Sequence, residues 1–196
     1  MPDRALSKAQ LRKELRLQRR TITASAQQIA AERVAIHFTQ LPQWHTSRRI
    51  ALYLPNDGEI GTACLASWCR EAGKQLFLPV ISASDLLEFA RWTGDEELVI
   101  NRYGIPEPPE HAERSPIAQL DILTLPLVGW DRLGGRLGMG GGFYDRALAG
   151  VSRTIKVGLA HALQQIPEIP QDEWDIALDF VATDAALHCC RSVSPG

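Results

Sequence analysis

The sequence predicts an α/β protein whose mainly parallel sheet has helices on both faces, as a three-layer α/β/α sandwich. Strand-like and helix-like segments alternate along the chain, which is the pattern of such sheets. The 196 residues suffice for one domain with its own core, and the hydrophobic content of 45% and charged content of 22% are ordinary for a globular protein. We therefore treat residues 1–196 as a single domain.

The first part of the chain begins with two predicted helices. Residues 8–20 are strong helix formers in which Leu11 and Leu15 lie one turn apart. A second helix is expected over residues 25–41, and Pro42 marks its end. Beyond it, apolar runs and turn residues predict a buried strand, a short helix and two further strands, over residues 49–55, 61–72, 75–81 and 86–92.

The second part of the chain contains a proline-rich segment and three more strands. Residues 101–119 are rich in proline and charge, and we expect them on the surface. Strands are predicted over 120–128, 154–160 and 178–184, and a helix begins at residue 143. Ligands of such sheets collect at the carboxyl ends of the strands, where this chain has NDGE after one strand and a glycine-rich run after another.

That glycine-rich run is RLGMGGGFYDR, residues 136–146. Its spacing matches neither the G-x-G-x-x-G dinucleotide fingerprint nor the G-x-x-x-x-G-K-[ST] phosphate loop. Glycines nevertheless let backbone N–H groups approach an anion, and Arg136 and Arg146 would add positive charge. Asp145, directly behind the loop, is placed to bind Mg²⁺ beside phosphate oxygens. The run therefore predicts a phosphate site, with a glycine-rich turn that binds no ligand as the alternative.

The charge and cysteine content bear on the class of function. A net charge of −2 gives no general reason to expect nucleic acid or an anionic membrane as a partner, although residues 1–20 contain seven basic and two acidic residues. No segment resembles a signal peptide or is long and apolar enough to span a membrane. The four cysteines suggest no disulfide framework, and HCC at residues 188–190 lacks a second ligand pair for zinc. We expect free thiols in a cytoplasmic monomer.

Several charged residues outside the glycine-rich run are less specific candidates. Lys8 and Arg12 are four residues apart and share one face of the first helix, a spacing also typical of a solvated stripe. Glu59 follows a strand end, and Asp175 and Asp179 lie around the last strand. Taken alone, each acid is more typical of a solvated surface position or a helix cap than of a ligand site.

Five motifs occur in one order along nearly the whole chain. They are KAQLR, IALYLPNDGEIGT, LVINRYGIPEP, LPLVGWDRLGGRLGMGGGFYDRAL and EWDIALDFVATD. In this order they resemble the motifs of the 5-formyltetrahydrofolate cyclo-ligase family, and the long glycine-rich motif is the most specific. The chain departs from the family's usual residues at Trp130, Met139 and Phe143. Of these, Met139 removes a hydrogen-bonding or charged group beside the substrate.

The resemblance implies an enzyme that converts 5-formyltetrahydrofolate to 5,10-methenyltetrahydrofolate with ATP and Mg²⁺, releasing ADP and phosphate. It also implies a fold related to sugar-phosphate isomerase and CoA-transferase domains. The residues it assigns to ATP are Lys8, Arg12, Arg136, Leu137, Gly138, Met139, Gly140, Gly141, Gly142, Phe143 and Tyr144. Those it assigns to the folate substrate are Leu54, Glu59, Met139, Gly140, Gly141, Gly142 and Phe143. It assigns Mg²⁺ to Asp145 and Asp175.

The chemistry of this reaction accounts for the residue types. A formamide oxygen is a poor leaving group, and its phosphorylation creates an activated carbon that N10 can attack. Phosphoryl transfer needs positioning and charge neutralisation, which arginines, backbone amides and Mg²⁺ provide. Phe143, Tyr144 and Trp92 are candidates to pack on the pterin ring, although core packing is the more common role for a tryptophan such as Trp92. Arg16 or Arg19 is a candidate to attract the anionic glutamate tail.

Two other classes of function stay open at this point. One is a protein that binds folate or nucleotide without turnover, which release of ADP would distinguish from an enzyme. The other is a nucleic-acid binder that uses the basic first helix, for which a steep salt dependence of binding would be the evidence.

Overall fold

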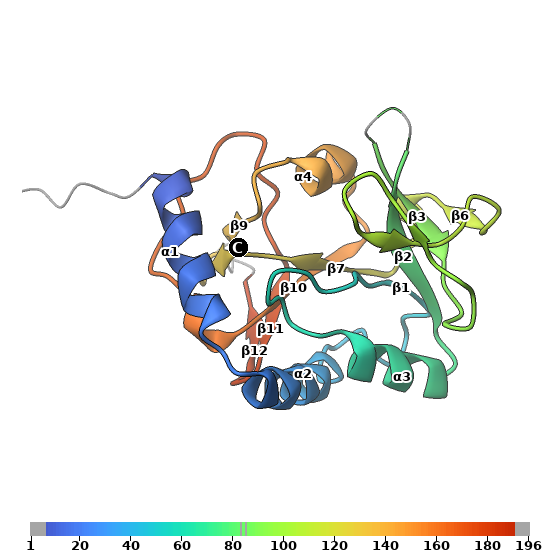
Figure 1. Cartoon of the computed structure of the whole chain (residues 1–196), viewed down its shortest axis with the longest axis horizontal. Helices are drawn as coiled ribbons and strands as arrows, with labels where there is room; N and C mark the ends of the chain where they lie inside the picture. Colours follow the sequence, from blue (N-terminus) through green and yellow to red (C-terminus); the bar gives the residue numbers. More distant parts are fainter. Residues whose placement is uncertain (1–6, 83, 85, 191–196) are drawn as a thin grey trace, which may run out of the picture.

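The computed structural model describes residues 7–82, 84 and 86–190. Within these residues the main feature is an eight-stranded sheet with helices on its two faces (Figure 1). The helices are α1 (Lys8–Arg20), α2 (Ala24–Phe38), α3 (Ala63–Glu71) and α4 (Phe143–Leu148), with 3₁₀ turns at Ile117–Gln119 and Ala162–Gln164. The strands of the large sheet are β1 (Arg49–Ala51), β2 (Gln75–Ile81), β3 (Leu87–Arg91), β6 (Arg114–Ser115), β7 (Ile122–Pro126), β10 (Ile155–Ala160), β11 (Phe180–Thr183) and β12 (Leu187–Cys189).

The strand order in this sheet is β12-β11-β10-β7-β1-β2-β3-β6. The five neighbouring strands from β11 to β2 run parallel, and antiparallel strands complete the two edges. In the middle of the sheet, Ile50 of β1 lies opposite Leu76 of β2 and Ile122 of β7. Two short hairpins lie outside the sheet, formed by β4 (Val99–Ile100) with β5 (Pro106–Glu107) and by β8 (Gly129–Trp130) with β9 (Arg136–Leu137).

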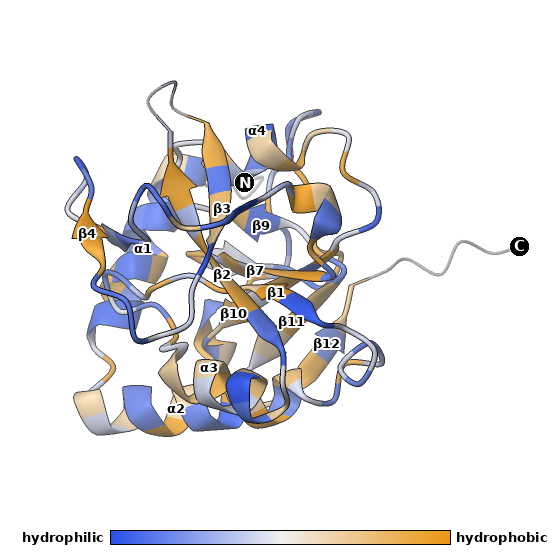
Figure 2. Ribbon diagram, turned by 90° about the vertical axis from the view of Figure 1, so that its right-hand side faces the viewer, coloured by the Kyte–Doolittle hydropathy of each residue, from blue (hydrophilic) through white to orange (hydrophobic). Residues whose placement is uncertain are grey.

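Successive side chains of the central strands point to opposite faces and belong to two separate cores. Ile50 and Leu52 pack with α2 and α3, whereas Ala51 between them packs on the other face. That second face is covered by α4, through Leu148, and by irregular segments on either side of it. Figure 1 shows α2 and α3 along one side of the sheet and α4 on the other, and Figure 2 shows apolar residues along the central strands.

Helix α1 packs by its middle against the β8–β9 hairpin. The Ser7 side chain caps the helix, and Leu15 is buried in a small core that includes Val128 and Leu137. Gly129 makes this close approach possible, because a Cβ atom there would lie 2.6 Å from the Leu15 side chain. The helix therefore lies beside the glycine-rich run that follows β9, rather than on a face of the sheet.

The predicted fold class is confirmed, with shorter strands than the sequence patterns indicated. The strand expected over 49–55 ends at Ala51, and the one expected over 120–128 divides into β7 and β8. The segment 101–119 is not wholly on the surface, because β6 joins the sheet and Ser115 is buried there. In the described part of the chain, no helix is both long and apolar enough to cross a membrane, and all four cysteines are free thiols. The expected relation to sugar-phosphate isomerase domains stays a prediction.

Candidate active site

A cavity of about 710 Å³ opens at the carboxyl ends of the parallel strands. All fifteen residues that the family resemblance assigned to a site line it. They are Lys8, Arg12, Leu54, Glu59, Arg136, Leu137, Gly138, Met139, Gly140, Gly141, Gly142, Phe143, Tyr144, Asp145 and Asp175. The fold thus brings together residues from the first helix, the loop after β1, the glycine-rich run and the loop before β11. Their individual roles stay predictions.

The glycine-rich run joins β9 to α4 and has a backbone that other residues rarely adopt. Gly140 has φ +100° and Gly142, which precedes the helix, has φ +64°. The Arg12 guanidinium donates to the Gly138 carbonyl oxygen at 2.8 Å and so ties this run to α1. Within the described residues, the backbone N–H groups of residues 139–142 donate no hydrogen bond, which leaves them available to an anion.

Arg136 provides buried positive charge at the base of this run. Its side chain is 6% exposed and donates to Asp145 Oδ1 at 2.7 Å. The guanidinium also lies 5.9 Å from the ring centre of Tyr144. Its Nε is buried and has no hydrogen-bond partner in the structure. Such an unpaired buried donor is costly unless an acceptor from a ligand reaches it.

Arg146, the arginine at the other end of the run, was expected to add positive charge to the phosphate site. It lies outside the cavity lining and instead donates to the Gly141 carbonyl oxygen at 2.8 Å, which stabilises the run.

Acidic residues face Lys8 on the same side of the cavity. Lys8 Nζ contacts Asp175 and lies 2.7 Å from Asp172 Oδ2. Burial lowers the pKa of Lys8, but the hydrogen bonds to Asp172 and Asp175 outweigh it and raise the pKa above the ordinary value. Burial raises the pKa of Asp175, whereas the Asp172 N–H and Lys8 lower it, with a net decrease. Both partners therefore stay charged at neutral pH.

The donor set suits a metal that brings most of its own ligands. Among the described residues, no group of three or more His, Cys, Asp or Glu side chains could hold an ion by itself. Asp145 and Asp175 are two carboxylates lining one cavity, with side chains 18% and 19% exposed. Mg²⁺ typically takes one or two protein carboxylates and completes its shell with water and phosphate oxygens. Two carboxylates are enough for Mg²⁺ where phosphate oxygens complete its shell, and binding of the ion by Asp145 and Asp175 stays a prediction.

Another part of the cavity lining contains apolar residues and one carboxylate of raised pKa. Leu54 and Glu59 lie there, beside the ends of β1 and β2. Burial raises the pKa of Glu59, and hydrogen bonding from the Asn56 N–H reduces the shift without reversing it. The charge of Glu59 in turn adds to burial in raising the pKa of both Tyr53 and Tyr144. A flat, partly polar ligand would be held here by apolar contact and by few polar groups.

Sequence reasoning missed several residues of this cavity. Tyr103, from the β4–β5 hairpin, packs edge-on against Phe143 with ring centres 6.1 Å apart. Trp174 is 69% exposed at the cavity and lies between Asp172 and Asp175 in the chain. Both residues fall inside motifs noted above, NRYGIPEP and EWD, but the motifs did not indicate which of their side chains would face a ligand. The local sequence gave no indication of which distant segments would contact each other in the folded chain.

Three expectations are corrected by the structure. Trp92 does not line the cavity; it packs with the core under α2 and α3, where the Arg70 guanidinium lies 4.3 Å from its ring centre. Arg19 is 1% exposed and bound to Asp57, so it is not free to attract a glutamate tail. The third is the solvated stripe considered for Lys8 and Arg12, because Lys8 is paired with Asp172 and Asp175 and Arg12 donates to the Gly138 carbonyl oxygen.

The carboxyl ends of the parallel strands thus open on a cavity lined by basic, glycine-rich and apolar segments. This arrangement is typical of an α/β enzyme that acts on small molecules. A model described as the 5-formyltetrahydrofolate cyclo-ligase family matches residues 4–184, and the chain belongs to this family. The 5-formyltetrahydrofolate cyclo-ligase of Escherichia coli K12 is 39% identical over 179 residues, covering 88% of this chain and 98% of the relative. That of Haemophilus influenzae is 39% identical over 174 residues, covering 86% and 93%. The structure of Aquifex aeolicus 5,10-methenyltetrahydrofolate synthetase matches with a TM-score of 0.84 at 29% identity, covering 96% of this chain and 95% of the other.

Proposed function

We propose that this chain converts 5-formyltetrahydrofolate to 5,10-methenyltetrahydrofolate with MgATP, releasing ADP and phosphate. The observation that carries the proposal is a single cavity that is lined by basic residues and the glycines of the glycine-rich run and also by apolar residues such as Leu54 and Phe143. Membership of the cyclo-ligase family supports the same reaction. The proposal also includes a cytoplasmic monomer that acts on small molecules, for which a cavity of about 710 Å³ has room.

The reaction needs two successive bond exchanges at the formyl group. The formyl oxygen attacks the γ-phosphorus of ATP, and the bond to the bridging oxygen breaks to release ADP. N10 then attacks the activated formyl carbon and loses its proton, the carbon–oxygen bond breaks, and phosphate leaves with the oxygen. In both steps the protein holds the groups in line and neutralises charge, so it needs no nucleophilic side chain of its own.

The cationic side of the cavity would bind the phosphates. Lys8, Arg12 and Arg136 line it, and the N–H groups of Gly140, Gly141 and Gly142 add donors without a side chain in the way. The unpaired Arg136 Nε supports this assignment, because a phosphate oxygen would satisfy it. Asp145 and Asp175 would hold Mg²⁺. When bound, the ion would neutralise charge on the phosphates.

The apolar side would bind the folate. Leu54 and Phe143 offer flat contact to the pterin, and Tyr103 extends that surface from the β4–β5 hairpin. Glu59 would accept hydrogen bonds from ring N–H groups of the substrate. Met139 is 52% exposed at the rim between the two sides, which fits contact with either ligand through its apolar side chain.

The direct test is the absorbance of the methenyl product, with ADP release measured in the same reaction. Purified chain with 5-formyltetrahydrofolate and MgATP should produce both in equal amounts. The Arg12→Gln variant should lose most of this activity, whereas Lys13→Gln is the matched control, because Lys13 is exposed on the same helix and does not line the cavity. Folate binding without ADP release would favour the alternative of a binding protein, and no ATP-dependent product would refute the proposal.

A further inference from the structure

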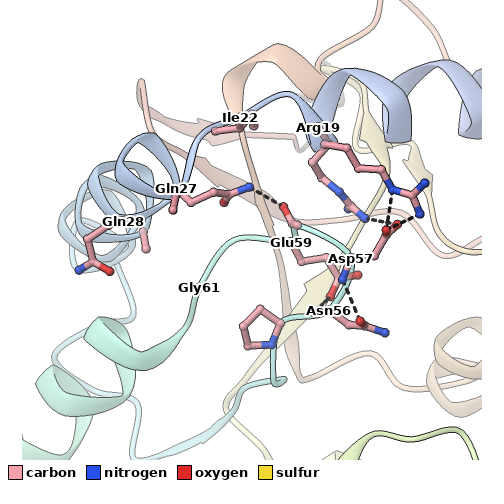
Figure 3. A pocket seen from close by; sticks show the side chains of 13 residues that line it. Arg19, Ile22, Gln27, Gln28, Asn56, Asp57, Glu59 and Gly61 are labelled. Carbon is pink, nitrogen blue, oxygen red and sulfur yellow. Dashed lines mark hydrogen bonds and ion pairs between the residues drawn. The ribbon is translucent and has the colours of Figure 1, made fainter.

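The loop after β1 separates the cavity from a second hollow. Asn56, Asp57 and Glu59 line both, so residues 55–59 form a thin partition that has the active-site cavity on one side and the groove between α1 and α2 on the other. Figure 3 shows this loop from the groove, with Arg19 of α1 and Gln27 of α2 reaching toward it. A partition with hollow space on both sides keeps its shape only if specific contacts hold it.

Within the loop, two hydrogen bonds between Asn56 and Glu59 set the position of Glu59. The Asn56 N–H donates to Glu59 Oε2 at 3.0 Å, and the Glu59 N–H donates back to the Asn56 carbonyl oxygen at 3.0 Å. Gln27 Nε2 donates to the Gly58 carbonyl oxygen at 3.1 Å. The orientation of Glu59 therefore depends on where the whole loop is placed.

Asp57 is the residue that fixes the loop to α1. Its carboxylate accepts from Arg16 Nε at 2.7 Å, Arg19 Nη2 at 3.1 Å and Arg20 Nη2 at 2.6 Å. Among described non-glycine residues, Asp57 has the one positive φ, +49°. Aspartate tolerates this conformation, and the three arginines on its carboxylate hold the loop in place. Although burial raises the pKa of Asp57, the hydrogen bonds from Arg16 and Arg20 bring it to about 2, so the contacts persist at neutral pH.

Arg19 extends this attachment into the sheet. Its side chain is fully buried, and Nη1 donates to the Leu127 carbonyl oxygen at 3.1 Å, just beyond the carboxyl end of β7. The same helix carries Lys8 and Arg12 on the cationic side of the cavity. One rigid element thus contacts the glycine-rich run near its start and the Glu59 loop near its end.

We propose that Asp57 is a positioning residue that couples the two halves of the cavity: by fixing the Glu59 loop to α1, it makes binding at the nucleotide side strengthen binding at the folate side. The inference rests on the proposed function. A helix that changes position or mobility when a nucleotide contacts Lys8 and Arg12 passes the change to the loop through Asp57. Two ligands that stabilise the same arrangement of α1 and the Glu59 loop bind more tightly together than apart.

The test measures this coupling by titration calorimetry. The affinity for 5-formyltetrahydrofolate is determined with and without saturating Mg²⁺ and a β,γ-methylene analogue of ATP, which binds but does not transfer phosphate. In the wild-type chain we expect the analogue to tighten folate binding about tenfold. In Asp57→Asn, which retains the shape and the tolerance of positive φ but not the charge, the tightening should fall below about twofold. Affinity for the analogue alone should stay within about threefold of the wild-type value, because Asp57 pairs with Arg16, Arg19 and Arg20 and not with Lys8 or Arg12.

Two further variants separate coupling from stability. Arg20→Gln removes two hydrogen bonds to Asp57 from a half-exposed side chain and should give intermediate tightening, even if Asp57→Asn does not fold. Asp121→Asn is the control, because this carboxylate accepts from the Arg48 and Arg49 N–H groups at the far end of β1; its tightening should equal that of the wild type. The coupling would be overturned if the analogue tightened folate binding equally in the wild type, Asp57→Asn and Arg20→Gln, or did not tighten it in the wild type. Product formation by the wild type would still uphold the proposed function in either case. Failure of the wild type to form product would instead refute the proposed function.

Discussion

Replacing Gly140 by alanine should impair the use of ATP while leaving the rest of the protein folded. Gly140 has φ +100°, a conformation that costs other residues about 1–3 kcal/mol. Space does not limit the substitution, since the nearest atom to an added Cβ is Arg12 Cζ at 3.6 Å. If the alanine loop relaxes to a common conformation, returning to the binding conformation costs the same energy. At an RT of about 0.6 kcal/mol, this corresponds to a loss of roughly 5- to 150-fold in kcat/KM for MgATP.

The assay is the initial rate of methenyl product formation over a range of MgATP concentrations, with thermal unfolding measured on the same preparations. Gly150→Ala is the matched control. Gly150 also has a positive φ, +77°, and open space around its position, but it does not line the cavity. Gly150→Ala should be less stable than the wild type in thermal unfolding, whereas its kcat/KM for MgATP should equal the wild-type value. Wild-type kcat/KM in Gly140→Ala would refute the argument that the backbone of this loop must hold the observed conformation.

Three further predictions concern other parts of the site. Asp145→Ala should lower kcat at least about 100-fold, because it removes a carboxylate proposed to hold Mg²⁺; wild-type turnover across a Mg²⁺ titration would show that the metal is bound elsewhere. Tyr103→Ala should raise KM for the folate about 2- to 10-fold with little change in kcat, as expected for loss of one aromatic contact; an unchanged KM would exclude this side chain from the folate site. The pKa of Asp57 is about 2 in the folded state, below its ordinary 3.8, so its charge stabilises the fold fully above about pH 4 and less as the pH falls toward 2. In urea titrations, the difference in unfolding free energy between wild type and Asp57→Asn should shrink over that range. A difference that does not change with pH would contradict the pairing of Asp57 with its arginines.

Much of the fold could be predicted from local patterns. The alternation of apolar runs and turn residues indicated the central strands, because strands buried on both faces are apolar throughout and turns need particular residues. The ends of the elements were less predictable. The chain after Ala51 stays apolar through Leu54, yet it leaves the sheet to form the cavity edge. The order β12-β11-β10-β7-β1-β2-β3-β6 also could not be predicted, since it depends on which strands meet after long connections.

By itself, the sequence determined the family, the glycine-rich run and fifteen of the residues that line the cavity, because these depend on residue types in a fixed order along the chain. Only the tertiary structure decided that Trp92 belongs to the core, that Tyr103 packs on Phe143, and that Asp57 joins its loop to α1. The physical reason is the range of the contacts. Asp57 and its arginines are about 40 residues apart, as are Tyr103 and Phe143, and nothing in the local pattern specifies which side chains meet over such separations once the chain is packed.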